Sequence, residues 1–128
     1  MSKLMTMAGT AIFLLAAATA DAADLGVAFT WDGTKACSSK PPAFKITGIP
    51  AGTKTLKFEM KDLDYRSYYH GGGSVDYAGS GDIPAGAFGY SGPCPPSGDV
   101  HRYRWTVEAL NANDDTLAEG TATESIPP

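Results

Sequence analysis

The 128-residue sequence has no cluster of lysine and arginine residues. Its 10 Lys and Arg residues are outnumbered by 14 Asp and Glu residues, which gives a formal net charge of −4. Domains that bind nucleic acids or anionic membrane surfaces usually carry a concentrated positive patch. The composition therefore argues against nucleic acids and anionic membranes as partners.

The sequence also lacks an apolar run long enough to cross a bilayer, which needs about 20 residues. Its main apolar run, Ala11–Ala20, follows a lysine and closes on the small-residue patterns ATA and ADA. These features are typical of a secretory signal peptide, and a retained membrane anchor is the weaker interpretation. The sequence predicts a signal peptide over residues 1–22, cleaved after Ala20 or Ala22, and one exported domain over residues 23–128, in the periplasm or secreted.

Cysteine is scarce, with Cys37 and Cys94 as the only two in the chain. In an exported protein, an even cysteine count favours a disulfide. Closing the long loop between these two residues would stabilise the fold by roughly 4 kcal/mol, because the unfolded chain loses entropy. The sequence predicts this disulfide, and two small buried thiols are the alternative.

Helical periodicity is missing from residues 23–128, whereas turn-forming residues are plentiful, with 15 glycines and 9 prolines in the whole chain. Short alternating runs between turn clusters predict an all-β domain, a small antiparallel β-sandwich with Greek-key-like connections. Six strands are predicted: Leu25–Trp31, Ala43–Thr47, Thr55–Asp64, Ser74–Ala78, His101–Asn111 and Leu117–Ser125.

Two of these strands carry apolar stripes that end in polar side chains. In the third predicted strand, the stripe formed by every second residue ends in Asp62 and Asp64. In the fifth, the corresponding stripe begins with His101 and Tyr103. Side chains alternate between the two faces of a strand, so antiparallel pairing with both stripes facing the core brings these four residues together. We therefore expect a polar site at one end of the core.

The segment Tyr68–Ser74, YYHGGGS, contains the HGGG string that lipases and esterases use in their oxyanion holes. Such hydrolases also need a G-x-S-x-G elbow between a strand and a helix, and the nearest match, Gly89–Pro93, lacks the last glycine. The required alternation of strands and helices is missing as well. The sequence therefore predicts no enzyme activity, with a weak hydrolase using His101 or Ser91 as the outlying alternative. The glycine run is explained more simply by close backbone approach or positive φ in a loop.

A longer motif is more informative. The segment Gly89–Tyr103, GYSGPCPPSGDVHRY, closely resembles the signature GYxGPCPPxGxxHRY of the bacterial branch of the phosphatidylethanolamine-binding protein family, also called Raf-kinase-inhibitor-like proteins. Further family blocks follow the same order, and the resemblance covers nearly all of residues 23–128. The matching blocks are Cys37 with Pro41-Pro42, Gly48–Lys54, Lys61–Asp64, Tyr68-x-His70 and Ala109-Leu110.

The resemblance implies a small antiparallel β domain with an anion pocket at one end. Carried over position by position, the implied ligand-binding residues are Asp62, His70, Gly92, Pro93, His101 and Tyr103. The sequence departs from the family pattern at Leu63, where the family has proline, and at Gly71, where it has an aromatic residue. No helical segment follows the last predicted strand, so we expect an open pocket.

The residue types suit an anion. A histidine can donate a hydrogen bond to an oxyanion while a carboxylate fixes its tautomer, and Tyr103 can add a hydroxyl donor. Backbone N–H groups near Gly92 or in Gly71–Gly73 can complete the site. The expected ligand is a phosphate or carboxylate group, of which a phospholipid head group is one instance, with no cofactor. The alternative is a protein-interaction or inhibitor module that uses the Gly92–Pro96 loop.

Each of these residues also has a purely structural interpretation. Asp62 and His101 would form an ordinary polar pair at a strand end. The tyrosines between Asp64 and His70 would be packing or surface aromatics. A metal site built from Asp62, His70 and His101 is disfavoured, because the sequence has no closely spaced His and Cys ligands.

Overall fold

The computed structural model describes residues 9–12 and 23–126. The predicted signal peptide falls almost entirely outside the described residues and stays a prediction. Within the described ranges, no helix has the length and hydrophobicity that a membrane span requires.

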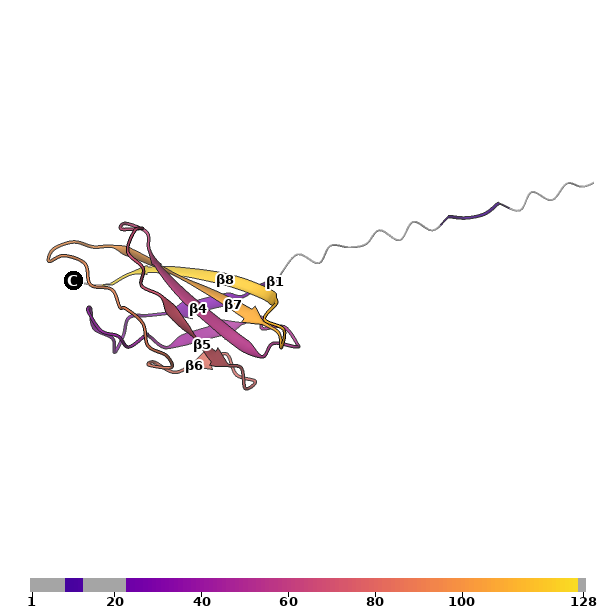
Figure 1. The fold of residues 1–128 in the computed structure, drawn as a ribbon, viewed down its shortest axis with the longest axis horizontal. Coiled ribbons are helices and arrows are strands. Elements are labelled where there is room, and N and C mark those ends of the chain that lie inside the picture. The colour runs from indigo at the N-terminus through magenta and orange to yellow at the C-terminus, as the bar shows by residue number, and fades with distance from the viewer. Residues whose placement is uncertain (1–8, 13–22, 127–128) are drawn as a thin grey trace, which may run out of the picture.

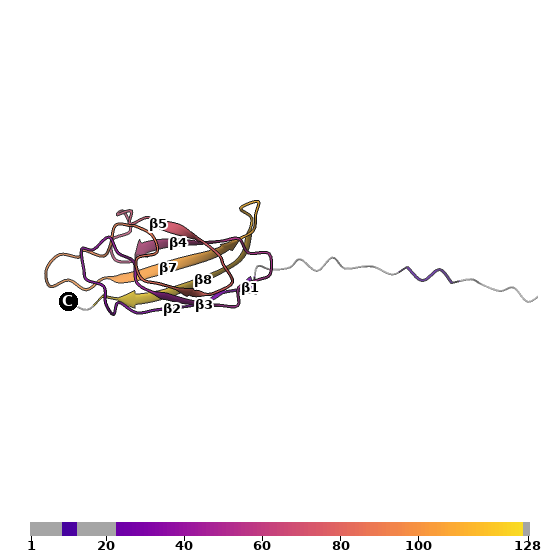
Figure 2. The same ribbon diagram turned by 90° about the horizontal axis from the view of Figure 1, so that it is seen from below.

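Residues 23–126 form two packed β-sheets, shown as separate layers in Figure 2. The larger sheet has the strand order β1-β8-β7-β4-β5, and the smaller has the order β2-β3-β6 (Figure 1). Neighbouring strands are antiparallel except β1 and β8, which pair in parallel. The strands are β1 (Ala23–Asp24), β2 (Gly26–Phe29), β3 (Phe44–Thr47), β4 (Thr55–Asp62), β5 (Gly72–Asp76), β6 (Asp82–Ile83), β7 (Arg102–Leu110) and β8 (Thr116–Ser125). The predicted all-β sandwich is confirmed.

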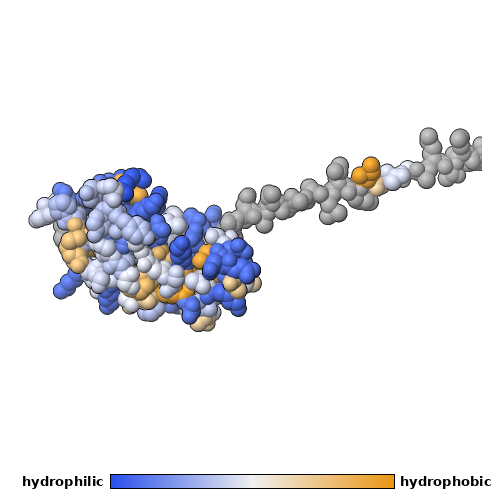
Figure 3. Space-filling model, viewed as in Figure 1, coloured by the Kyte–Doolittle hydropathy of each residue, from blue (hydrophilic) through white to orange (hydrophobic). Residues whose placement is uncertain are grey.

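The core lies between the two sheets and follows the predicted two-residue period. In β4 the inward residues from Leu56 to Asp62 are buried and alternate with more exposed ones. Phe44 of the smaller sheet packs on Phe58 of β4 and Trp105 of β7, with ring centroids 4.8 Å and 5.1 Å apart. Each such buried side chain contributes about 1.5–3 kcal/mol through removal of apolar surface from water. On the face shown in Figure 3, hydrophobic residues accordingly appear only as small separate areas.

β4 and β7 are antiparallel neighbours, as the two stripes predicted. The register sets Thr55 opposite Leu110 at one end and Asp62 opposite Tyr103 at the other. The polar ends of both stripes therefore meet at one end of the sandwich.

All six predicted strands are present, but β1 and β6 were not predicted, because two residues are too short to show alternation. β5 begins at Gly72 rather than at the predicted Ser74. A Cβ atom at Gly72 would lie 1.8 Å from the carbonyl oxygen of Phe58, and one at Gly73 would lie 2.6 Å from Phe88. The glycine run therefore lets Phe88 cover β5 closely, and only Gly71 has a positive φ, of 77°.

The predicted disulfide between Cys37 and Cys94 is confirmed, with the two Cα atoms 4.4 Å apart. It ties the loop before β3 to the loop before β7. Cys37 has a left-handed backbone with φ of 62°, which typically costs a non-glycine residue roughly 1–3 kcal/mol. The bond holds two irregular segments together beside the polar end of the core.

Candidate functional site

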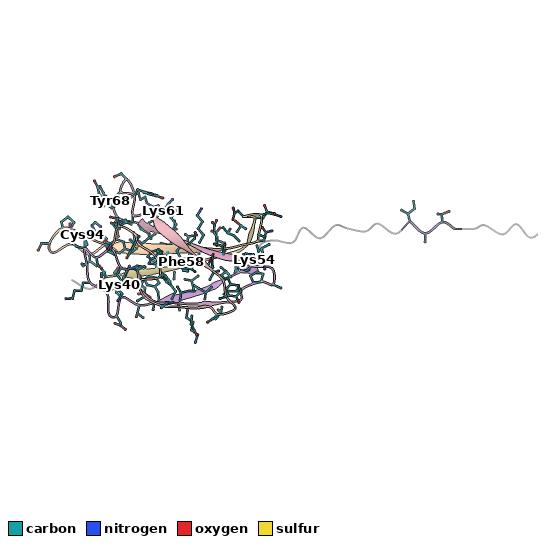
Figure 4. All side chains as sticks on the ribbon, turned by 60° about the horizontal axis from the view of Figure 1, so that its bottom comes forward. Lys40, Lys54, Phe58, Lys61, Tyr68 and Cys94 are labelled. Atoms are coloured by element: carbon teal, nitrogen blue, oxygen red, sulfur yellow. A yellow bond between two sulfur atoms is a disulfide. The ribbon has the colours of Figure 1, made fainter. Side chains whose placement is uncertain are left out.

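A cavity of about 520 Å³ opens at the end of the sandwich where β4 stops and β7 starts. The strand ends contribute Asp62 and Tyr103, and the loops 63–71 and 91–101 form the walls. Figure 4 labels Tyr68 and Cys94, one from each loop, at this end of the domain. Five of the six predicted ligand-binding residues line the cavity: Asp62, His70, Gly92, His101 and Tyr103.

Asp62 and His101 form the central pair of the cavity. Asp62 is only 3% exposed, and its Oδ2 atom lies 2.6 Å from Nδ1 of His101. Its Oδ1 atom accepts the backbone N–H groups of Asp64 and Tyr65 at 2.8 Å and 3.0 Å. The carboxylate is therefore engaged within the protein, and its effect on a ligand acts through the imidazole it orients.

The hydrogen bond that His101 donates to Asp62, together with the charges of Asp62, Asp64 and Asp99, raises the pKa of His101 above its ordinary value, although desolvation opposes the shift. With Nδ1 donating to Asp62, the protonated ring has its Nε2–H group left to donate to a ligand. When His101 is protonated, the pair therefore provides a positively charged hydrogen-bond donor at the end of the core.

Tyr103 lies beside this pair and is fully buried. Burial, reinforced by the charges of Asp62 and Asp64, raises the pKa of Tyr103 to about 12, so its hydroxyl stays protonated at neutral pH. In the part of the chain that the structure describes, this hydroxyl has no hydrogen-bond partner. A buried polar group without a partner costs about 1–3 kcal/mol, which an incoming acceptor would relieve.

His70 closes the inner wall of the cavity and is 5% exposed. Its Nδ1–H group donates to the backbone carbonyl of Ser91 at 2.6 Å, which fixes the tautomer of the neutral ring. The ring packs edge-on against Tyr68 and Tyr103, with centroid distances of 4.6 Å and 5.7 Å. Its second nitrogen, Nε2, is an acceptor in the neutral ring and a donor in the protonated one.

Of the two loop residues Gly92 and Pro93, the first lies in the cavity wall and the second in the interior of the domain. Gly92 lines the cavity, and a Cβ atom there would lie 1.8 Å from the carbonyl oxygen of Ser38, so only glycine fits. Pro93 is fully buried and is not among the lining residues. Its carbonyl accepts the backbone N–H of Cys37 at 2.6 Å, so it positions the loop rather than facing a ligand.

The glycines after His70 are not part of the cavity wall. Gly72 and Gly73 pair with β4, and neither they nor Gly71 line the cavity. The expected backbone N–H contribution from this run is therefore wrong, because strand pairing occupies the segment.

Two acidic wall residues lay outside the predicted ligand-binding set: Asp64, which the stripe pattern had placed at this end of the core, and Asp99. Asp64 binds Arg102 through three hydrogen bonds, from the backbone N–H and from Nε and Nη2. These bonds lower the pKa of Asp64 to about 2. Asp99 also lines the cavity and forms no ion pair within residues 23–126. Asp62 is bonded to His101 and Asp64 to Arg102, whereas Asp99 has no such partner within residues 23–126.

Two tyrosines also belong to the wall. Tyr65 and Tyr68 line the cavity with roughly parallel rings whose centroids are 6.4 Å apart. Their spacing in the sequence gave no sign of this position, because they belong to a loop without periodicity.

The hydroxyl of Ser91 is not paired with an imidazole. Its Oγ atom lies 2.8 Å from the Tyr68 hydroxyl, and His70 contacts the Ser91 carbonyl instead. Nucleophilic catalysis by serine requires a base within hydrogen-bond reach of the hydroxyl. Ser91 Oγ therefore has no imidazole base within hydrogen-bond reach in the described residues.

The chain is similar to known proteins in part of its sequence and in its fold. Residues 70–126 match the family model described as phosphatidylethanolamine-binding protein. No curated protein sequence matches the chain significantly.

Two solved structures share the fold. E. coli YbcL, described as a new member of the mammalian PEBP family, is 19% identical with a TM-score of 0.61, and the match covers 83% of this chain and 99% of YbcL. CT736 of Chlamydia trachomatis, described as a phosphatidylethanolamine-binding protein homologue, is 18% identical with a TM-score of 0.55, covering 70% of this chain and 82% of CT736. Residues 70–126 are thus similar to the phosphatidylethanolamine-binding protein family, and the chain shares its fold with these two structures.

Proposed function

We propose that this domain is an exported binding protein that takes a phosphate or carboxylate group into the cavity at the end of the sandwich where β4 stops and β7 starts. The observation that carries the proposal is the buried Tyr103 hydroxyl, which has no partner in the described chain and lines the same cavity as His101. Protonated His101 supplies a charged donor, and charge-assisted hydrogen bonds are roughly twice as strong as neutral ones. The predicted signal peptide is the support for export.

The anion is held by donors rather than by a high positive charge. Asp62 is bonded to His101 and to two backbone N–H groups, so it does not face the ligand as a free acceptor. Asp64 is likewise bonded to Arg102. The anionic group would bind the hydrogen-bond donors of His101 and Tyr103.

A phospholipid head group that carries an ammonium fits the remaining wall. Asp99 can pair with the ammonium, and the faces of Tyr65 and Tyr68 attract cations through their ring electrons. Phosphoethanolamine would then bind more tightly than inorganic phosphate, by about three- to tenfold for a partly exposed cation–π contact.

NMR titration of the domain with phosphate, acetate and O-phosphoethanolamine tests the proposal. We expect chemical-shift changes centred on His70, His101 and Tyr103 and their loss in His101→Gln. No response to any of the three ligands, or shifts elsewhere on the domain, would contradict the proposal.

The pH dependence gives a second measurement. Sulfate keeps the same charge between pH 5 and 9, so any change in its affinity reports on the protein. The affinity should be greatest while His101 is protonated and fall as the pH rises through its raised pKa. A flat profile would show that His101 is not the charged donor.

A second function is favoured by the exposed residues around the cavity. Among the large hydrophobic side chains of residues 23–126, the exposed ones are Tyr65, Tyr68, Tyr69 and Val100, with exposed fractions of 47–78%. All four belong to the two loops that form the cavity walls. Tyrosines concentrated around a pocket are typical of protein-interaction sites, which supports the inhibitor or interaction module. Capture of a stoichiometric partner by the wild type but not by Tyr69→Ser would support it.

A further inference from the structure

A second hollow adjoins the ligand cavity and differs from it in chemistry. This cleft of about 440 Å³ shares Tyr68, Gly92 and Cys94 with the cavity and is otherwise lined by the loop before β3 and by Tyr90 and Ser91. No charged side chain is among its lining residues. Its polar groups are the hydroxyls of serine and tyrosine, so we name it the hydroxyl cleft.

Three of the hydroxyls that line this cleft can donate to a ligand, namely those of Ser38, Ser39 and Tyr90. Ser38 Oγ accepts the backbone N–H of Lys40 at 3.1 Å, which leaves its own O–H to donate. Ser39 and Tyr90 line the cleft, and their hydroxyls form no hydrogen bond in the part of the chain that the structure describes. The half-buried Tyr90 has a raised pKa, mainly through burial, and so remains a hydroxyl donor at neutral pH.

The cleft and the cavity are held at a fixed spacing. Tyr68 stands between them, and its hydroxyl is 2.8 Å from Ser91 Oγ. Gly92 is pressed against the carbonyl of Ser38, and the disulfide from Cys94 ties the same two loops. The free-energy cost of ordering the protein would therefore be small for a ligand that occupies both hollows.

We propose that the hydroxyl cleft binds the uncharged part of the ligand, and that the ligand class is a phosphate ester of a polyol or sugar. This inference rests on the proposed function, because the phosphate occupies the cavity of His101 and Tyr103. Neutral hydroxyls that both donate and accept match the hydroxyls of a polyol, and the exposed ring of Tyr68 offers an apolar face for its C–H groups. An alkyl chain would leave the serine hydroxyls without a partner.

Isothermal titration with paired ligands tests the inference. Glycerol 3-phosphate and propyl phosphate carry the same phosphate on three carbons and differ in two hydroxyls, and glucose 6-phosphate extends the series. We expect the two hydroxylated ligands to bind about tenfold more tightly than propyl phosphate, the gain expected from one or two additional neutral hydrogen bonds. NMR shifts should extend to Ser39 and Tyr90 only with these two ligands.

Substitutions in the hydroxyl cleft test whether the gain in affinity for hydroxylated ligands arises there. Tyr90→Phe and Ser39→Ala should remove most of the tenfold gain and leave propyl phosphate binding unchanged. Ser97→Ala, an exposed serine of the same loop region outside both hollows, is the matched control and should leave the gain intact. Glycerophosphoglycerol is a soluble phosphate diester, like a lipid head group, whereas glycerol 3-phosphate is a free monoester. The affinities of these two ligands therefore distinguish the two sources of the same chemistry.

The two proposals fail in different ways. If propyl phosphate binds at His101 but neither hydroxylated ligand binds more tightly, the polyol inference is overturned and the anion site stands. If none of the phosphates binds, the proposed function fails and the inference fails with it.

Discussion

The two ends of the β4–β7 strand pair use polar groups in opposite ways. At the end where Thr55 faces Leu110, the hydrogen bonds made by side chains are local. Thr53 Oγ1 donates to the Pro50 carbonyl three residues away, and Asn111 Oδ1 accepts the backbone N–H groups of residues two and four positions later. We call this the turn end, and Figure 4 labels Lys54 there.

At the end where Asp62 faces Tyr103, which we call the pocket end, the contacts join distant parts of the chain. His101 bonds to Asp62 across 39 positions, and His70 bonds to Ser91 across 21. One buried hydroxyl there, that of Tyr103, has no partner within the described residues. The turn end is satisfied by its own sequence, whereas the pocket end depends on the whole fold and retains hydrogen-bonding capacity for a ligand.

The largest test of this contrast is removal of the disulfide that crosses the pocket end. Cys37→Ser combined with Cys94→Ser should lower the free energy of unfolding by about 4 kcal/mol, since it restores the entropy of a loop with a sequence separation of 57 residues. The melting temperature should fall by roughly 15–30 °C. Urea unfolding followed by tryptophan fluorescence measures the change.

The same double variant should lose anion binding even below its melting temperature, because Cys94 no longer holds the loop of Gly92 against the cavity. Wild type reduced with a dithiol is the control and should behave alike. Unchanged affinity in the folded variant would show that the strand ends alone form the site.

The next largest effect on stability is expected from the apolar part of the β4–β7 strand pair, near the turn end. Leu56 is fully buried and lies opposite Ala109, close to the turn end. Leu56→Ala should destabilise the domain by about 3 kcal/mol through lost burial and a cavity. Phosphate affinity, measured where the variant is fully folded, should be unchanged. A parallel loss of affinity would mean that the two ends are not independent.

The apolar stripes were the part of the fold that the sequence could predict. The two-residue period sets which side chains face the core, and the positions of Asp62 and His101 on adjacent stripes predicted their meeting, found at 2.6 Å. The pairing of β4 with β7 was the assumption on which that meeting depended, and the structure shows it. Short strands such as Asp82–Ile83 were missed, because two residues carry no period.

The cavity walls could not be predicted in the same way. Asp99 and Tyr65 reach the cavity from loops whose course is fixed by tertiary contacts, such as the packing of Gly92 on Ser38. The inward position of Pro93 follows from the same packing. Motif resemblance located the loop, but only the fold decides which of its atoms face a ligand.

A smaller effect is expected from Tyr103→Phe, which should change binding at the pocket end without lowering stability. Tyr103→Phe removes a buried hydroxyl without a partner, so stability should be unchanged or slightly higher. Affinity for phosphate should fall about tenfold, the value of roughly one hydrogen bond to a charged group. Tyr77→Phe, a partly buried tyrosine outside the cavity, is the matched control for titration calorimetry. Equal affinities for the two variants would contradict a role for Tyr103 in binding.

The smallest effect concerns acid stability. The hydrogen bonds from Arg102 lower the pKa of Asp64 from 3.8 to about 2. A depressed pKa contributes stability that is present above the unfolded value and is lost as the pH falls through the folded value. The melting temperature of the wild type should therefore drop more steeply between pH 4 and pH 2 than that of Asp64→Asn, by a few degrees.

The matched control is Asp76→Asn, which changes an exposed acid at the far end of β5 and should follow the wild-type curve. Parallel curves for wild type and Asp64→Asn would mean that the Arg102 contact is broken in solution, leaving the Asp62–His101 pair as the polar tie between the two strand ends.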